Sequence, residues 1–129
     1  MPNTEPTLQL AQPKFNKAFQ LFCNILFKAY CPLTAINKPD FDGPFILCSN
    51  HSSHLDTPVL MQATGLPLSK FVSIAAKDYF FHEGKKRSLS SRLLNLAPLD
   101  RSSSLKDLGN TANLCRDFLQ TQQGGLLLY

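Results

Sequence analysis

The chain lacks several features that would assign a protein to a class at once. Its 129 residues include no tryptophan and only six glycines, and no run of 18 apolar residues occurs. The missing run excludes an ordinary membrane-spanning helix, and scarce, unperiodic glycine excludes a collagen-like chain. Charged residues are few, at 17%, while 43% are hydrophobic, which excludes a disordered chain. The length suits one domain of ordinary size.

Cysteine motifs and a secretory signal are also missing. None of the four cysteines forms a C-x-x-C pair, which argues against zinc-ribbon and thioredoxin-like proteins. We expect Cys23, Cys48 and Cys115 to be small buried hydrophobes in a reducing, cytosolic environment. Residues 1–13 are polar and proline-rich rather than basic and then apolar, so they are predicted to be a disordered lead-in.

The charge of the chain is modestly basic. The formal net charge is +4, and one basic cluster comprises Lys85, Lys86, Arg87 and Arg92. A basic balance suits nucleic acid, an anionic membrane or an acidic substrate. Because aromatic RNA-binding motifs and zinc-finger spacing are absent, we expect no nucleic-acid partner.

Residues 14–31 are predicted to form an amphipathic helix that ends before Pro32. Its apolar residues recur at helical spacing and are Phe15, Ala18, Phe19, Phe22, Ile25, Leu26, Ala29 and Tyr30. Its polar residues, expected on the other side, are Asn16, Lys17, Gln20, Asn24 and Lys28. Two interpretations stay open: a helix that faces the core, and a helix that lies in a bilayer interface. Residues 14–36 form this segment of the predicted organisation.

Short apolar strands alternate with helices in the rest of the chain. Strands are predicted at 45–48, 71–76, 96–99 and 125–129, and helices near 58–64, within 78–95 and from 105 to about 122. The last helix starts at a capping-box-like Ser104 and Asp107. Its predicted buried face comprises Leu105, Leu108, Ala112, Cys115, Phe118 and Leu119. This alternation favours an α/β fold with a partly parallel sheet flanked by helices and preceded by the amphipathic helix.

Polar residues follow three of the predicted strands. His51, Lys77 and Arg101 each come just after a strand. Ligands of parallel sheets bind beyond the carboxyl ends of the strands, so these residues are site candidates.

The pair His51 and Asp56 carries the strongest chemical signal. On a compact loop that enters a helix, the carboxylate can accept a hydrogen bond from one imidazole nitrogen and orient the ring. The other nitrogen can then remove a proton from a substrate hydroxyl, which attacks an acyl carbon. No protein nucleophile is needed.

This segment, Asn50-His51-Ser52-Ser53-His54-Leu55-Asp56, resembles the H-x4-D block of the glycerolipid acyltransferase family, which includes 1-acylglycerol-3-phosphate acyltransferases. Ala76-Lys77 resembles the family's A-K segment, and Leu99-Asp100-Arg101 resembles its second block, which ends in arginine. The resemblance covers roughly residues 40–129, and the blocks occur in the family's order.

The resemblance is incomplete in two places. His54 is an additional histidine in the first block, and the E-G-T-R-like third block is missing after Leu126-Leu127-Leu128-Tyr129. Residues 37–129 are therefore expected to be the first part of an acyltransferase domain whose C-terminal part is missing. We expect the last strand to be a severed core strand and the sheet cut there to expose an unpaired edge and apolar faces. The chain alone is expected to be poorly soluble or dependent on a membrane.

The resemblance implies acyl transfer from acyl-CoA or acyl carrier protein to the hydroxyl of a lysophospholipid or glycerol phosphate, in phospholipid biosynthesis. It makes His51 the general base and Asp56 its orienting partner. Arg101 would pair with the acceptor's phosphate, and Lys77 and Asn50 are further substrate-binding candidates. No metal or other cofactor is implied. The expected location is the cytoplasmic face of a membrane, peripheral or monotopic.

Three alternatives remain beside this reading. One is an incomplete acyltransferase-like fragment that only binds a membrane or a partner. Another is a metallohydrolase that uses His51, His54 and Asp56, although the metallo-β-lactamase pattern fails at two of its four ligand positions. A serine hydrolase built on Ser52 or Ser53 lacks the usual G-x-S-x-G turn.

Overall fold

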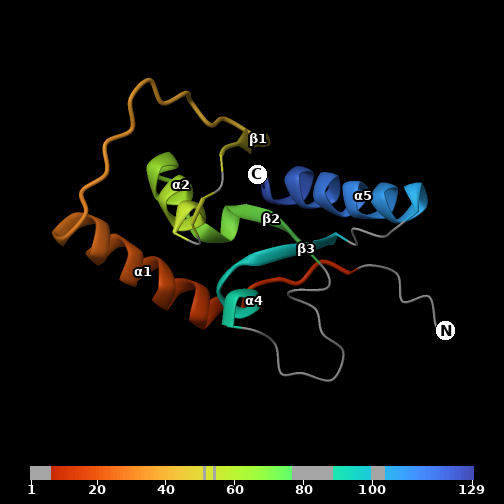
Figure 1. The fold of residues 1–129 in the computed structure, drawn as a ribbon, viewed down its shortest axis with the longest axis horizontal. Coiled ribbons are helices and arrows are strands. Elements are labelled where there is room, and N and C mark those ends of the chain that lie inside the picture. The colour runs from red at the N-terminus through yellow and green to blue at the C-terminus, as the bar shows by residue number, and fades with distance from the viewer. Residues whose placement is uncertain (1–6, 51, 54, 77–88, 100–103) are drawn as a thin grey trace.

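The protein folds as an α/β sheet domain with an N-terminal helix (Figure 1). The computed structural model describes residues 7–129 except 51, 54, 77–88 and 100–103, and it leaves out the side chains of Ala76 and Ser90. The elements are α1 (Pro13–Ala29), β1 (Phe45–Cys48), α2 (Asp56–Thr64), the 3-10 turn η1 (Leu68–Lys70), β2 (Phe71–Ala76), α4 (Leu89–Leu93), β3 (Asn95–Leu99), α5 (Leu105–Gln122) and β4 (Gly125–Leu128). The predicted fold class and strands are confirmed.

The four strands form one parallel sheet in the order β1-β4-β2-β3. Because all pairs are parallel, the carboxyl ends of the strands lie at one edge of the sheet. β4 pairs with β1 on one side and with β2 on the other. The strand that we expected to be a core strand is therefore an interior strand, and the outer strands of the sheet are β1 and β3. The expected poor solubility stays a prediction.

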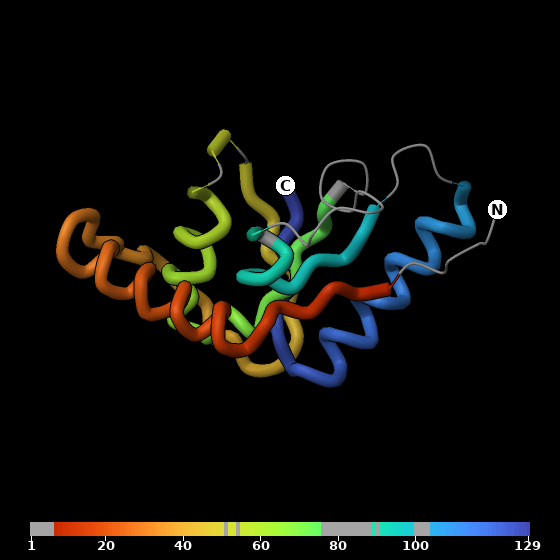
Figure 2. The backbone as a smooth tube through the Cα atoms, turned by 90° about the horizontal axis from the view of Figure 1, so that it is seen from below, coloured from red at the N-terminus to blue at the C-terminus, as the bar shows by residue number. Residues whose placement is uncertain are grey.

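Helices cover both faces of the sheet. On one face, α1 and α2 pack over a core cluster of Met61, Leu68, Phe71 and Leu127. On the other face, α5 packs against the sheet through a second core cluster. It comprises Val72, Ala97 and Leu126 of the strands with Cys115 and Phe118 of α5. Figure 2 shows α5 on the side of the sheet opposite α2. Strands enclosed in this way read as continuous apolar runs, which is why they were recognisable in the sequence.

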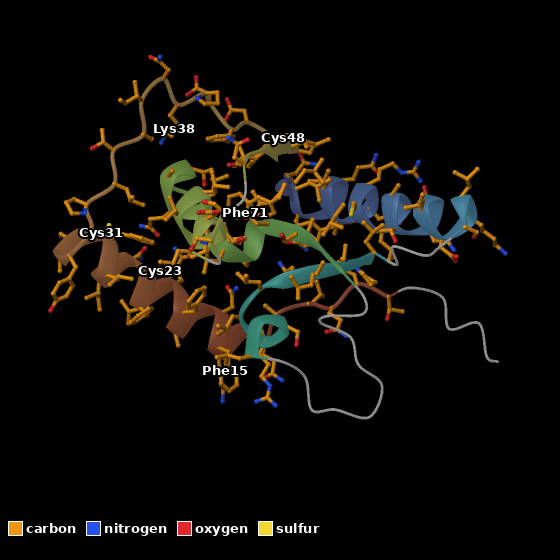
Figure 3. All side chains as sticks on the ribbon, viewed as in Figure 1. Phe15, Cys23, Cys31, Lys38, Cys48 and Phe71 are labelled. Carbon is orange, nitrogen blue, oxygen red and sulfur yellow. The ribbon has the colours of Figure 1, made fainter. Side chains whose placement is uncertain are left out.

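Helix α1 turns a different side toward the protein than its apolar periodicity predicts. Its buried residues are Asn16, Cys23 and Phe27. Asn16 Nδ2 donates to the carbonyl of Leu93 (2.7 Å), and Gln20 Oε1 accepts from the backbone N–H of Leu68 (2.6 Å). These side-chain amides form hydrogen bonds with backbone groups of α4 and η1. The bonds offset the cost of burying polar side chains. Figure 3 shows Cys23 on the side of α1 toward α2 and Phe15 on the outer side.

The apolar face predicted for α1 is therefore largely exposed. Exposure reaches 43% at Phe15, 58% at Phe22 and 57% at Ile25. Two neighbouring apolar side chains, Leu21 and Tyr30, are exposed as well. We call Phe15, Leu21, Phe22 and Ile25 the outer face of α1. No helix among the described residues is long and apolar enough to cross a membrane.

The end of the lead-in is ordered, contrary to expectation. Gln9 forms an antiparallel bridge with Leu96, with both N–H···O distances at 2.9 Å. The N–H of Ala11 donates to Asn95 Oδ1 (2.8 Å), and that of Gln12 donates to the carbonyl of Arg92 (2.9 Å). The segment is held because it pairs with the otherwise open edge of β3.

Helix α5 begins with the predicted capping box but is buried over a shorter stretch than predicted. Ser104 donates to Asp107 Oδ2 from its N–H (3.3 Å) and from its Oγ (3.0 Å). Leu105 and Leu108 are exposed, because the first turn of the helix extends past the core cluster. Ala112, also predicted to be buried, is exposed. The buried residues are Thr111, Cys115 and Phe118, and Thr111 donates to the carbonyl of Pro98 (2.8 Å).

The cysteines divide into two classes. Cys23 and Cys115 are buried, and burial raises the pKa of each thiol, so both behave as small apolar groups as expected. Cys48 is exposed, contrary to prediction, because it faces away from the core on the outermost strand β1. Cys31 is exposed just beyond α1.

Candidate functional site

The loop that carries the predicted dyad leaves the sheet beside its interior strand. The N–H of Ser49 donates to the carbonyl of Leu128 (3.0 Å), which extends the pairing of β1 with β4 by one residue. The exposed Asn50 follows, and the chain enters α2 at Asp56. The segment thus crosses the carboxyl edge of the sheet, where ligands of parallel sheets bind.

The carboxylate of Asp56 closes this loop. Its Oδ2 accepts hydrogen bonds from the backbone N–H groups of Ser52 (2.7 Å) and Ser53 (2.8 Å). The N–H of Asp56 in turn donates to the carbonyl of Ser53 (3.0 Å). A carboxylate that bonds backbone N–H groups a few residues earlier is typical of tight loops at helix starts. Asp56 is therefore held in one orientation by the loop that contains His51.

A second contact joins the same loop to the end of β4. The hydroxyl of Tyr129 hydrogen-bonds with Thr57 Oγ1, 72 residues away in the sequence. Burial raises the pKa of the Tyr129 phenol; the bond to Thr57 lowers it and the nearby charge of Asp56 raises it. The net shift is upward, so the phenol stays protonated at neutral pH and can donate to Thr57.

The predicted site residues fall into two groups. Asn50 and Asp56 lie in the described part of the edge loop, whereas His51, His54, Lys77 and Arg101 lie outside the described residues. The strands that precede them, β1, β2 and β3, are described and all end at the same edge. The topology therefore fits the expectation that polar residues after three strands belong to one site, and the residues themselves stay predictions.

Tyr129 and Thr57 are site neighbours that sequence reasoning missed. The sequence alone indicates only that Tyr129 ends an apolar strand and that Thr57 precedes a proline at the start of a helix. The signal that could have found Tyr129 is its place directly after β4, since β4 is parallel to the other strands and ends at the same edge.

The described residues contain no group of three or more His, Cys, Asp or Glu side chains that could hold a metal ion. Two of the three ligands of the metallohydrolase alternative, His51 and His54, lie outside the described residues. In the structure the described third ligand, Asp56, directs Oδ2 to backbone N–H groups of its own loop.

Comparisons with known proteins give one match. The model of the protein family described as Acyltransferase matches residues 30–129. The match takes in the whole sheet and the edge loop and leaves out all of α1. No curated protein and no solved structure matches the chain.

Proposed function

The chain belongs to the acyltransferase family, and from that premise we propose that it moves a fatty acyl group from an acyl thioester to a lysophospholipid or glycerol phosphate. The donor is acyl-CoA or acyl carrier protein, and the role is in phospholipid biosynthesis. One observation carries the proposal: Asp56 is fixed by two N–H groups within the loop that begins with His51. Such a loop supplies a positioned acid–base pair without a protein nucleophile.

The proposed chemistry is addition of the acceptor hydroxyl to the acyl carbon followed by loss of the thiolate. His51 takes the proton of the acceptor hydroxyl, and the oxygen forms a bond to the thioester carbonyl carbon. The tetrahedral intermediate then collapses, the carbon–sulfur bond breaks, and the imidazolium returns the proton to the leaving thiolate. Asp56 orients the ring and stabilises the imidazolium while it exists.

The proposed acceptor site uses the neighbouring strand ends. Arg101, two residues after β3, would bind the acceptor's phosphate through two parallel hydrogen bonds. Lys77, directly after β2, adds positive charge, and the exposed Asn50 offers donors beside His51.

We therefore expect Arg101→Lys to raise KM for a phosphorylated acceptor about tenfold, because a lysine cannot make the paired contact. Initial rates over a series of acceptor concentrations measure this, and an unchanged KM would remove Arg101 from the phosphate site.

We further propose that the protein associates peripherally with the cytoplasmic face of a membrane through α1. Phe15, Phe22 and Ile25 on the outer face are 43–58% exposed along one stripe of the helix. Cations lie at its borders: the guanidinium of Arg92 lies 5.8 Å from the centre of the Phe15 ring, and Lys14 and Lys28 are exposed. An apolar stripe bordered by cations is typical of helices that lie in a bilayer interface.

Replacing two outer-face residues tests this membrane contact. We expect Phe22→Ser with Ile25→Ser to weaken vesicle binding roughly 30-fold, from a loss of about 1 kcal/mol of apolar burial for each side chain. Sedimentation with vesicles that contain anionic phospholipid measures it. Leu105→Ser with Leu108→Ser is the matched control, because these exposed residues lie on α5, which covers the other face of the sheet. Equal losses in both variants would refute a specific role of α1.

A transfer assay tests the proposed reaction. The full 129-residue chain is mixed with labelled acyl-CoA or acyl carrier protein and with 1-acylglycerol-3-phosphate or glycerol phosphate, and the product is separated by extraction. We expect label in a phospholipid product in the presence of vesicles. Vesicle binding without transfer to either acceptor would favour the alternative of an incomplete fragment.

A further inference from the structure

A cavity lies away from the edge loop, where the C-terminal end of α2 meets α1 and the segment that follows α1. Its volume is about 560 Å³, and the lining residues used below are Asn24, Phe27, Lys28, Lys38, Gln62 and Gly65. α2 begins at Asp56, and Gly65 caps its other end. Nine helical residues span about 13 Å, so the cavity is separate from the loop proposed to carry catalysis.

The cavity is lined by cations and by no carboxylate. Lys28 comes from the last turn of α1 and Lys38 from the following segment, and the described lining residues include no Asp or Glu. Neither ammonium group forms an ion pair or a hydrogen bond with another described residue. A Cβ atom placed on Gly65 would lie 3.7 Å from Lys38 Nζ, so this amine is near the carbonyl end of α2, which favours a cation. Figure 3 shows Lys38 on the segment that arches over α2.

A buried acceptor without a partner lies in the same wall. Gln62 Oε1 is shielded from solvent and has no hydrogen-bond partner among the described residues. Buried acceptors are normally satisfied, and an exception points to a missing donor. A ligand that satisfies both features carries an anion for the two lysines and an O–H or N–H donor for Gln62. A phosphate ester with a hydroxyl or ammonium on its headgroup has both.

We propose that this cavity binds the headgroup of an intact membrane phospholipid, with its phosphate between Lys28 and Lys38. The headgroup hydroxyl or ammonium donates to Gln62 Oε1 once the Gln62 side chain, which lines the cavity, rotates and exposes that oxygen. The cavity adjoins the membrane-facing helix, since Asn24, Phe27 and Lys28 of α1 line it while Phe22 and Ile25 form the outer face. The inference rests on the proposed membrane association and not on the proposed acyl transfer.

Charge-matched variants of the full chain test the phosphate contact. Vesicles of phosphatidylcholine with phosphatidylglycerol are the probe, and sedimentation is the measurement. We expect Lys28→Gln with Lys38→Gln to weaken binding at least tenfold. The control is Lys106→Gln with Arg116→Gln, which removes the same charge from exposed residues of α5 that do not line the cavity. We expect a loss below threefold for the control, and an equal loss in both double variants would overturn the site in favour of diffuse attraction.

A second pair of lipids tests the donor contact. Phosphatidylmethanol has the same phosphodiester charge as phosphatidylglycerol but no donor on its headgroup. We expect wild-type protein to prefer phosphatidylglycerol vesicles several-fold and Gln62→Leu to lose that preference while still binding both. A preference that survives in Gln62→Leu would overturn the role assigned to this side chain. Thermal unfolding of each variant separates loss of binding from loss of fold.

A soluble competitor separates a lipid headgroup from a free phosphate ester. Glycerol phosphate is titrated into ¹⁵N-labelled protein without vesicles, and the amide resonance of Gly65 is followed. We expect no saturable shift at millimolar concentration, because the headgroup gains its affinity from attachment to the bilayer. A saturable shift that disappears in the Lys28 and Lys38 double variant would assign the cavity to a soluble phosphate ester and overturn the lipid assignment. All these readouts are of binding, so a chain without transferase activity would still test the site.

Discussion

Asp56→Asn is expected to lower acyl-transfer turnover by about 10³-fold or more while leaving the loop and the vesicle binding intact. An asparagine Oδ1 can still accept from the N–H groups of Ser52 and Ser53, so the loop remains closed. The substitution removes the negative charge that, in the proposed mechanism, stabilises the imidazolium of His51 and selects its tautomer. In comparable acid–base pairs this loss costs several kcal/mol of transition-state stabilisation. Single-turnover rates with a labelled acyl thioester measure the effect.

The structure supplies a control for this exchange within the same chain. Asp107 also accepts hydrogen bonds at the start of a helix, from Ser104, but it belongs to α5. Asp107→Asn should leave turnover unchanged, and His51→Ala should lose turnover at least as completely as Asp56→Asn. Wild-type turnover in Asp56→Asn would show that Asp56 only closes the loop, and would remove it from the mechanism.

Gly124→Ala is expected to destabilise the fold by about 3 kcal/mol or more, the upper range for overpacked sites. Gly124 is buried between α5 and β4, and an added Cβ would lie 1.9 Å from the backbone carbonyl oxygen of Lys70. The clashing atoms belong to the backbone of Lys70, directly before β2. The added Cβ can therefore be accommodated only if β2 shifts relative to β4. Chemical or thermal unfolding should show a lowered midpoint.

Gly109→Ala is the matched control for the glycine exchange. Gly109 is an exposed residue of α5, and nothing lies within 4 Å of an added Cβ there. Alanine is the better helix former by about 1 kcal/mol, so this variant should be slightly more stable than the wild type. A Gly124→Ala protein as stable as the wild type would contradict the close approach of the chain at Gly124.

The strands could be predicted because of where they lie. A parallel strand covered on both faces needs apolar residues at nearly every position, and the interior strands Phe71–Ala76 and Gly125–Leu128 meet that need. The site motif was recognisable for a different reason. A histidine and a carboxylate with fixed spacing are read directly from the chain, and the match to the acyltransferase family confirms the family that they suggested.

The faces of the helices could not be predicted, because periodicity locates an apolar stripe without saying what it contacts. In α1 the side that packs contains Asn16 and Gln20, whose amides complete the hydrogen bonding of backbone groups in α4 and η1. In α5 the apolar pattern begins at Leu105, but the core begins only at Thr111. Which side of each helix is buried depends on hydrogen-bond partners 13 to 77 residues away in the sequence. The periodicity within a helix carries no information about those partners.

The buried Asn95 has a mechanical consequence for the membrane association that we propose. Its Nδ2 donates to the carbonyls of Ser69 (3.2 Å) and Phe71 (2.9 Å), and its Oδ1 accepts from Ala11, two residues before α1 begins. The side chain of Asn95, a residue of β3, thus ties the residues just before α1 to the start of β2 through hydrogen bonds. These bonds fix the start of α1 relative to the sheet. The depth to which α1 sinks would then set the height of the edge loop above the lipid. Acceptor hydroxyls would be selected by how far they stand out of the membrane as well as by their chemistry.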